Sequence, residues 1–197
     1  MTKRAFDAGV TLAVAPFSLI VTLAMAIALA VELRGWPFFV QARVGLNETP
    51  FRMYKLRTMR HAKPGEEPAR VVDDWEHYVF SPPGGVHPRI TRLGGFARRT
   101  SLDELPNLLN VFLGQMSLVG PRPEIPEIVE QYPDAYRRRH SVRPGIAGLA
   151  QVRGRSDLPY DEIMKYDLAY VDDHSFLGDL RLLCETAQVV IRREGAR

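Results

Sequence analysis

The sequence predicts an α+β protein, mostly α-helical, in which an N-terminal membrane helix precedes a small cytosolic domain with short strands and amphipathic interfacial helices. Three observations lead to this prediction: an uncharged apolar stretch from Ala8 to Val31, two short aromatic-rich segments, and several later segments with helical spacing. Apolar residues make up 46% and charged residues 25% of the chain, which argues against disorder and against a polytopic membrane protein. We expect residues 1–35 to form the membrane anchor and residues 36–197 the cytosolic domain.

The apolar stretch is long enough to cross a bilayer, since as one helix it would reach about 36 Å against roughly 30 Å of hydrocarbon. Pro16 lies inside it and removes a backbone donor. Basic residues flank both ends of the stretch: Lys3, Arg4, Arg34 and Arg43. Because Lys and Arg favour the cytoplasmic side, we expect a re-entrant helix that breaks at Pro16 and dips into one leaflet. Hydroxyls of Thr11 or Ser18 would then cover the freed backbone groups.

Two other interpretations of this stretch are a simple span with a kink and a secretory signal peptide. The signal peptide is the weaker of the two, because its apolar region would be shorter than the run that continues to Val31.

A single cysteine, Cys184, excludes an internal disulfide framework and is compatible with a reducing compartment. The net charge of +3 permits attraction to anionic lipid, nucleotide or nucleic acid, and it does not distinguish among these three classes of partner.

The remaining elements follow from local pattern. Strands are expected in two segments on either side of a Gly45-Leu46-Asn47 turn, and residues 61–89 are expected to form a proline-rich surface excursion with one amphipathic turn around residues 71–78. The predicted strands are Phe38 to Val44 and Phe51 to Met59. The predicted helices are Leu102 to Leu113, Glu124 to His140, Tyr160 to Val171 and Gly178 to Arg193.

Several common catalytic patterns are missing from the sequence. It contains no phosphate-binding G-x-x-x-x-G-K-[ST] loop, no G-x-G-x-x-G fingerprint and no G-x-S-x-G elbow. Its five histidines show no paired ligand spacing, so a structural zinc site is not expected. Catalysis would therefore depend on carboxylates, arginines and a hard cation.

The adjacent carboxylates Asp103 and Glu104 are the candidates for this chemistry. Pro106 predicts a helix start just before it, which places both carboxylates at the helix N-terminus. The run from Ser101 to Glu104 also fits a capping box, a purely structural role. Cations in stretches without helical spacing favour phosphate chemistry instead, since guanidinium groups bind phosphate in a bidentate manner. These cations are Lys55, Arg57, Arg98, Arg99 and Arg122.

The chain resembles the bacterial sugar transferase family, the monotopic phosphoglycosyl transferases that begin glycan assembly on polyprenol phosphate. Five motifs in order carry the resemblance, which extends over nearly the whole chain. They are Gln41-Ala42-Arg43-Val44-Gly45, Lys55-Leu56-Arg57-Thr58-Met59, the run from Arg98 to Pro106, the run from Met116 to Pro123, and the run from Arg143 to Val152. In this family Ser commonly precedes the helix-breaking proline, whereas here Ala15 precedes Pro16.

The resemblance implies a UDP-sugar donor, a polyprenol phosphate acceptor such as undecaprenyl phosphate, release of UMP, and a location on the cytosolic face of the bacterial inner membrane among its phospholipids. It implies that Asp103 is the nucleophile and that Glu104, with Asp103 nearby, holds Mg²⁺. It further implies that Arg98 and Arg122 contact phosphate or nucleotide, and that Pro121, Lys55, Arg57 and Gln151 lie in substrate-binding motifs. These roles predict a covalent phosphosugar on Asp103.

A different class of function is a non-enzymatic, membrane-anchored basic protein that binds anionic lipid or nucleic acid. The enzyme interpretation requires no nucleic acid, and it leaves a homo-oligomer open. The identity of the sugar and of the glycan pathway has no sequence signature.

Overall fold

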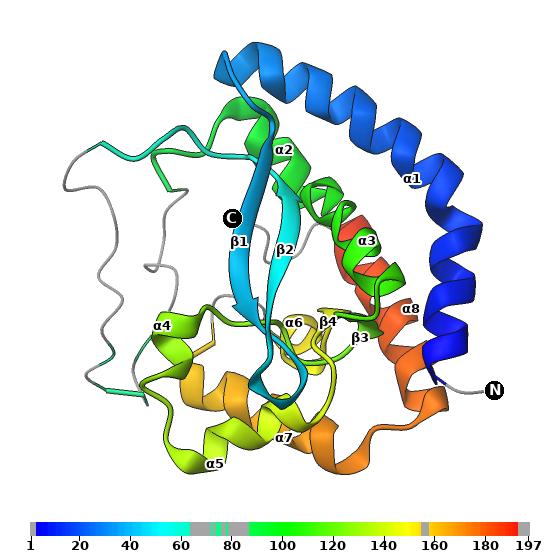
Figure 1. The fold of residues 1–197 in the computed structure, drawn as a ribbon, viewed down its shortest axis with the longest axis vertical. Helices are drawn as coiled ribbons and strands as arrows, with labels where there is room; N and C mark the ends of the chain where they lie inside the picture. The colour runs from blue at the N-terminus through cyan, green and yellow to red at the C-terminus, as the bar shows by residue number, and fades with distance from the viewer. Residues whose placement is uncertain are drawn as a thin grey trace.

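The computed structural model describes residues 3–63, 72, 74, 75, 78, 87–154 and 158–192. Figure 1 shows a long N-terminal helix bending around one side of a domain built from a β-hairpin, short helices and two longer C-terminal helices. The described elements are α1 Lys3–Leu33, β1 Phe38–Val44, η1 Leu46–Glu48, β2 Pro50–Leu56, α2 Arg92–Arg99, η2 Leu102–Glu104, α3 Asn107–Phe112, β3 Ser117–Val119, α4 Pro126–Val129, α5 Asp134–Arg137, η3 Arg138–Ser141, β4 Gly145–Ala147, α6 Leu149–Arg153, α7 Tyr160–Asp173 and α8 Phe176–Arg192.

Helix α1 continues through Pro16 as one element of 31 residues. The expected interruption at this proline is therefore wrong, and the change of direction is a bend within a continuous helix (Figure 1). The Ser18 hydroxyl donates a 3.1 Å hydrogen bond to the carbonyl of Ala15 beside the proline, one of the two hydroxyl contacts that the sequence suggested. The Thr11 hydroxyl is buried and makes no hydrogen bond to any residue the structure describes.

Helix α1 has its apolar side facing outward. The face against the domain is mostly polar and consists of Asp7, Thr11, Ser18, Thr22, Ala26 and Leu29. Large apolar side chains on the other faces are exposed, among them Leu12, Phe17, Leu19, Ile20, Leu23, Ile27 and Val31. A helix on the surface of a water-soluble protein has the reverse arrangement. Within the described residues, α1 is the one helix long and apolar enough to cross a membrane, and its outward face is typical of a surface that contacts lipid.

The start of α1 is fixed to the domain by polar contacts. Arg4 donates 2.5 Å hydrogen bonds to the carbonyls of Val111 and Phe112 at the end of α3. The buried Asp7 carboxylate accepts a 2.8 Å hydrogen bond from the Ser117 hydroxyl. The start of α1 is therefore packed against the domain, and the division of the chain near residue 35 stays a prediction.

The two predicted strands are confirmed, and they pair as a hairpin. Strands β1 and β2 pair antiparallel in the register Phe38 with Leu56 through Val44 with Pro50, so β2 ends three residues before the predicted Met59. A second sheet, in which β3 pairs parallel with β4, was not predicted. Strands of three residues are too short to show alternation in sequence.

Helices α7 and α8 confirm two of the four predicted helices. The single helix predicted from Glu124 to His140 is wrong, because the chain there forms α4, α5 and η3 as separate short elements with Pro133 directly before α5. The helix predicted from Leu102 to Leu113 divides into η2 and α3. Most of the expected excursion at residues 61–89 lies outside the described residues.

The core has two main clusters of buried side chains. One joins β2, β3 and β4 to α7 and α8, and the other joins α4 to α7 through Ile128, Tyr132, Tyr160 and Met164. Val72, Trp75 and Tyr78 pack against the second cluster. The segment from Gly120 to Glu124, which carries the predicted site residues Pro121 and Arg122, connects Val119 of the first cluster to Ile125 of the second.

Candidate active site

The carboxylates Asp103 and Glu104 lie on the single turn η2, between α2 and α3. Ser101 enters this turn in the left-handed conformation, with φ of 56°, and its side chain caps nothing. The capping-box alternative is therefore wrong. The predicted position in the first turn of a helix is also wrong, because α3 begins only at Asn107. Glu104 is held by tertiary contacts instead.

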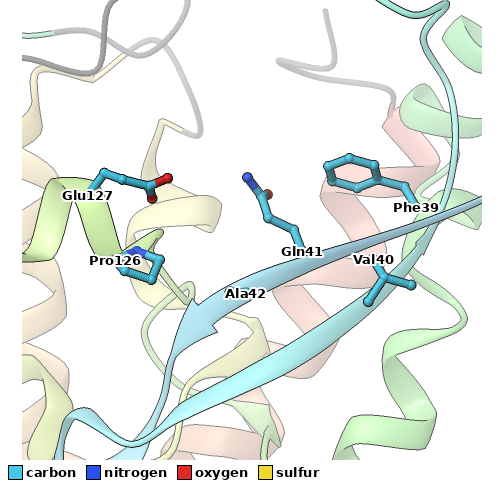
Figure 2. A pocket seen from close by; sticks show the side chains of 6 residues that line it. All are labelled: Phe39, Val40, Gln41, Ala42, Pro126 and Glu127. Atoms are coloured by element: carbon cyan, nitrogen blue, oxygen red, sulfur yellow. The ribbon is translucent and has the colours of Figure 1, made fainter.

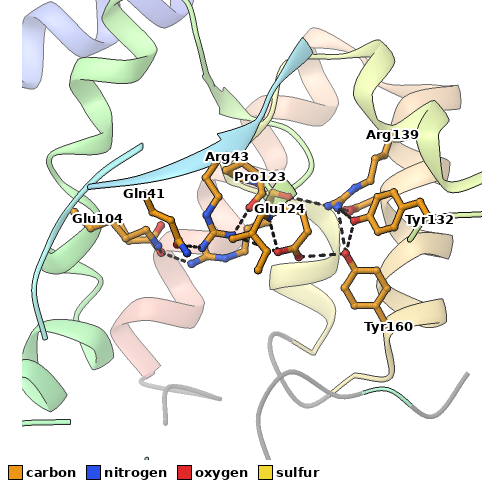
Figure 3. A network of polar contacts seen from close by, with 12 residues as sticks. Gln41, Arg43, Glu104, Pro123, Glu124, Tyr132, Arg139 and Tyr160 are labelled. Carbon is orange, nitrogen blue, oxygen red and sulfur yellow. Dashed lines mark hydrogen bonds and ion pairs between the residues drawn. The ribbon is translucent and has the colours of Figure 1, made fainter. Parts of the chain in front are cut away.

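Glu104 bridges two cations that come from distant parts of the chain. Its Oε1 atom lies 3.0 Å from the Nζ of Lys55 and 2.9 Å from an Nη2 of Arg122. The side chains of Lys55 and Glu104 are largely buried, whereas that of Arg122 is 45% exposed. Figure 3 shows Glu104 at one end of a polar network that continues through the segment around Pro123. Three predicted site residues are thus in direct contact.

The hairpin is attached to α3 by the fully buried Asn110, which positions Lys55 opposite Glu104. The Asn110 amide donates a 2.7 Å hydrogen bond to the carbonyl of Arg52 and accepts a 3.2 Å bond from the backbone N–H of Tyr54. Buried amides that satisfy strand backbone groups fix the relative position of the elements they join. Lys55 is the next residue along the strand.

Arg122 follows β3 in a segment that is fixed to β4. The backbone N–H of Gly120 donates to the carbonyl of Ala147, and that of Gly145 donates to the carbonyl of Pro121. A Cβ atom on Gly145 would lie 2.1 Å from the backbone nitrogen of Gly120, so only glycine allows this close approach. The predicted site residue Pro121 therefore contributes its carbonyl to the structure that holds Arg122.

Burial and charge act in opposite directions on the two carboxylates. Burial alone would raise the pKa of Glu104, but Arg122 and Lys55 more than offset it and hold that pKa well below its usual range. Burial and the negative charge of Glu104 raise the pKa of Asp103, while Lys55, Arg98 and Arg122 oppose the rise. Burial and the charge of Arg122 lower the pKa of Lys55 to about 8. Glu104 is therefore a permanent anion, and Asp103 depends on nearby positive charge to remain ionised.

Arg98 lies in the last turn of α2, with Nη1 4.0 Å from the sulfur of Met59. The expectation that the cations Arg98 and Arg99 lie in irregular backbone is wrong, since both belong to a helix, and Lys55 lies in a strand. Arg98 acts on the pKa of Asp103 through its charge. Its position at a helix C-terminus is one that favours a cation.

Two predicted binding residues make their contacts elsewhere. An Nη1 of Arg57 lies 2.7 Å from the Nε2 of His61, and Nε2 of Gln151 donates a 3.0 Å hydrogen bond to the carbonyl of Ile146. Neither contact involves Asp103 or Glu104. Their proposed roles in binding substrate remain predictions.

A buried polar network behind Arg122 was not predicted as part of the site (Figure 3). Nη2 of Arg139 donates 2.7 Å to the carbonyl of Arg122 and pairs with Asp167 at 2.5 Å. The same guanidinium donates to the hydroxyl of Tyr132, which contacts that of Tyr160. The network continues from Tyr160 to Glu124 and from Glu124 to Arg43.

The network also changes the interpretation of Arg43. This residue was expected to flank the membrane, but its side chain is mostly buried and donates to Glu124, to the carbonyl of Pro123 and to Gln41. The motif around Arg43 was the one sequence signal for the network. Arg139 and Asp167 have none, because no local pattern identifies an ion pair between separate elements.

Two adjacent carboxylates at this position, Asp103 and Glu104, offer oxygen ligands of the kind that a divalent cation prefers. Mg²⁺ typically binds one or two protein carboxylates and completes its shell with water and substrate phosphate. Asp103 and Glu104 fit that donor set as two adjacent carboxylates, and the contacts of Glu104 with Lys55 and Arg122 both involve its Oε1 atom. Among the described residues, no cluster of three or more His, Cys, Asp or Glu side chains offers a complete protein site.

The comparison of the whole sequence with protein families matches residues 1–193 to the model described as bacterial sugar transferase. The chain belongs to the bacterial sugar transferase family. The match includes α1 as well as the domain, which agrees with the way Arg4 and Asp7 join the two.

Curated relatives of the family support this assignment. The chain is 39% identical over 158 residues to the uncharacterized sugar transferase EpsL of Bacillus subtilis, covering 80% of this chain and 71% of that protein. It is 35% identical over 200 residues to the exopolysaccharide production protein ExoY of Rhizobium meliloti, covering all of this chain and 88% of the relative. It is 49% identical over 109 residues to an undecaprenyl-phosphate galactose phosphotransferase of Salmonella typhimurium, covering 55% of this chain and 23% of that protein. The chain therefore spans most of some relatives and less than half of others.

Proposed function

We propose that this protein transfers a sugar 1-phosphate from a UDP-sugar to undecaprenyl phosphate, with release of UMP, and so begins the synthesis of a surface glycan. Family membership and the names of relatives support this class of reaction, since two similar proteins are named as undecaprenyl-phosphate galactose phosphotransferase and as UDP-glucose:undecaprenyl-phosphate glucose-1-phosphate transferase. The observation that carries the proposal is the contact of Glu104 with both Lys55 and Arg122 beside the buried Asp103.

In the first step, an Oδ atom of Asp103 attacks the phosphorus that bears the sugar. The bond between this phosphorus and the oxygen bridging to the second phosphate breaks, and UMP leaves with the electron pair. An anion that attacks an anionic phosphate needs surrounding positive charge, which Lys55, Arg98 and Arg122 supply. The product of this step is an acyl phosphate, in which the sugar phosphate is bonded through phosphorus to an Oδ atom of Asp103.

In the second step, a phosphate oxygen of the acceptor attacks the same phosphorus. The bond between phosphorus and the Oδ atom of Asp103 breaks, the carboxylate is regenerated, and the sugar diphosphate lipid leaves. Since one site serves both substrates in turn, the polyprenol phosphate uses the same cations as the donor. Arg122 is the most exposed of the three side chains in contact and is therefore the one most accessible to either substrate.

Asp103 and Glu104 are the residues that would hold Mg²⁺ in this reaction. When bound, the ion supplies positive charge against the donor diphosphate and the bound carboxylates. Such charge would also oppose the raised pKa of Asp103 and favour its ionised, nucleophilic form. Transfer activity that persists in excess chelator would remove the ion from this account.

We further propose that α1 is re-entrant, with the domain on the cytosolic face of the inner membrane. Its exposed apolar face, the bend in α1 and basic residues at both ends support this topology. The site would then lie where a water-soluble donor and a lipid acceptor meet.

The covalent step is tested with the donor alone. Incubation of the full-length protein in detergent or nanodiscs with a panel of UDP-sugars is expected to give a phosphosugar on Asp103, detected by mass spectrometry, and about one equivalent of UMP. Asp103→Asn is expected to give neither, since an amide does not displace UMP. Asp172→Asn, an exposed carboxylate in a surface ion pair, is the matched control and retains both. Absence of the adduct in the unaltered protein would overturn the covalent mechanism.

Topology is tested by labelling. In a Cys184→Ser background, which removes the exposed native thiol, single cysteines at positions 2 and 45 are probed with an impermeant reagent in inside-out and right-side-out vesicles. Labelling of both from the cytosolic side supports the re-entrant helix. Labelling from opposite sides would establish a simple span.

A further inference from the structure

A groove lies between the outer edge of the hairpin and α4. It has a volume of about 420 Å³ and is lined by Phe39, Val40, Gln41, Ala42, Pro126 and Glu127. Figure 2 shows the side chain of Gln41 rising from β1 between the ring of Phe39 and the carboxylate of Glu127. The volume falls within the usual range for small-ligand sites, and the lining combines an aromatic ring with polar groups.

The strand register places this groove next to the carboxylate site. Phe39 lies directly opposite Lys55, whose ammonium contacts Glu104. Since opposite residues of an antiparallel pair share one face with Cβ atoms roughly 5 Å apart, Phe39 and Lys55 are neighbours on that face. Alternation puts Gln41 and Arg43 on the same face. Phe39 and Gln41 of the groove therefore share one face of the hairpin with Lys55, the cation that contacts Glu104.

The buried network orients the side-chain amide of Gln41, a polar group of the groove. Nη2 of Arg43 donates a 2.8 Å hydrogen bond to Oε1 of Gln41, and Arg43 is itself held by Glu124. This contact fixes the Gln41 amide with its N–H groups available as donors; among the described residues they have no acceptor. A ligand that presents hydroxyl oxygens matches those donors.

Phe39 is a large hydrophobic residue, yet it is 44% exposed. Its ring therefore offers a flat apolar surface to a ligand. The face of an aromatic ring is electron-rich and attracts polarised C–H groups, such as those on one side of a pyranose. An aromatic platform beside a fixed amide donor is the arrangement expected for a sugar ring.

We propose that this groove binds the sugar moiety of the donor and contributes to sugar selectivity through Phe39 and Gln41. The inference rests on the proposed function, in which Asp103 attacks the phosphorus bonded to the sugar. The sugar therefore lies one bond from the reacting phosphate, and the groove is one cross-strand neighbour from Lys55. The nucleoside is attached to the other phosphate and lies farther from this surface.

The proposal is tested by binding, which does not require turnover. Affinities of the full-length Asp103→Asn protein for a UDP-sugar that the unaltered enzyme uses, and for UMP, are measured by titration calorimetry with and without Phe39→Ala. Loss of the ring is expected to weaken UDP-sugar binding roughly tenfold. UMP affinity is expected to be unchanged, and Phe39→Tyr is expected to restore UDP-sugar binding.

Phe176→Ala is the matched control, because Phe176 at the start of α8 is an aromatic residue of similar exposure, 42%, that does not line the groove. It is expected to leave both affinities unchanged. In otherwise unaltered protein, Gln41→Leu is expected to change the ratio of kcat/KM between two UDP-sugars that differ at one hydroxyl.

The outcomes separate the inference from the function on which it rests. Equal weakening of UMP and UDP-sugar binding by Phe39→Ala would assign the groove to the nucleoside and overturn the inference. No effect on either affinity would also overturn it. Failure of the unaltered protein to release UMP, with sugar-dependent binding intact, would overturn the proposed reaction and leave the sugar site standing.

Discussion

Arg139 donates a 2.7 Å hydrogen bond to the carbonyl oxygen of Arg122, the residue whose guanidinium pairs with Glu104. The site is thus supported from behind by a guanidinium that is 3% exposed and that Asp167, 2% exposed, neutralises. Because both charges are removed from water, neither is stable in the interior without the other. The orientation of Arg122 depends on this pair.

Asp167→Asn is expected to lower the free energy of unfolding by about 3–5 kcal/mol, since it leaves the Arg139 charge buried without its counter-ion. UMP release should fall as well, because the backbone at Arg122 loses a fixed donor. Urea unfolding in detergent checks the stability. Asp172→Asn provides the comparison, because its ion pair with Arg138 is exposed and is expected to contribute about 0–1 kcal/mol. Equal effects of the two variants would contradict the assigned role of the pair.

Activity is expected to decline as pH rises through about 8, because Lys55 has its pKa lowered from 10.5 to about 8 by burial and by Arg122. Above that pH the ammonium loses its proton, and Glu104 loses one of its two cationic partners. Lys55→Arg keeps the charge at every accessible pH and should remove this decline. The measurement is the rate of UMP release between pH 7 and pH 10.

The same shift predicts the opposite trend in stability. Between pH 8 and 10.5 the unfolded chain holds a proton on Lys55 that the folded chain has released. The contribution of Lys55 to the free energy of unfolding therefore increases with pH across this window. Lys55→Met, which does not titrate, should show a smaller increase in denaturation experiments. A larger increase in this variant would contradict the prediction.

His140 is expected to destabilise the protein in acid. Burial and the charge of Arg139 lower the pKa of this histidine to about 4, against 6.5 in the unfolded chain, although Glu48 opposes the shift. The unfolded chain takes up the proton first, so stability falls as pH decreases from 6.5 to 4, by roughly 3 kcal/mol in total. His140→Phe keeps a ring stacked on Tyr132 and removes this titration. The free energy of unfolding of both proteins, measured across this pH range, gives the difference.

Gly94→Ala and Gly95→Ala are expected to have different effects although the residues are adjacent in α2. A Cβ at Gly94 would lie 2.1 Å from the carbonyl oxygen of Thr58, so helix and backbone would have to separate. A Cβ at Gly95 would meet a flexible Arg99 nitrogen at 3.3 Å. We expect a loss of several kcal/mol and of activity for Gly94→Ala, because α2 carries Arg98. Gly95→Ala should be neutral or up to about 1 kcal/mol stabilising, as judged by thermal unfolding.

Local sequence predicted the elements that depend on neighbours along the chain. The uncharged stretch predicted α1, the two aromatic-rich segments on either side of a turn predicted β1 and β2, and sustained helical spacing predicted α7 and α8. The same reasoning failed between Glu124 and His140, where apolar spacing suited a helix but Pro133 divided the chain into short elements. It also failed at Pro16, because removal of one donor bends a long helix without ending it.

The sequence by itself therefore determined the long apolar N-terminal helix, the two strands and the adjacent carboxylates with their family motifs. Only the tertiary structure decided what surrounds those carboxylates. Lys55 reaches Glu104 across 49 positions of the chain, and Arg139 reaches Asp167 across 28. Hydrogen-bonded periodicity is a local property that leaves a repeating signal, whereas an ion pair between separate elements depends on how the whole chain packs and leaves none.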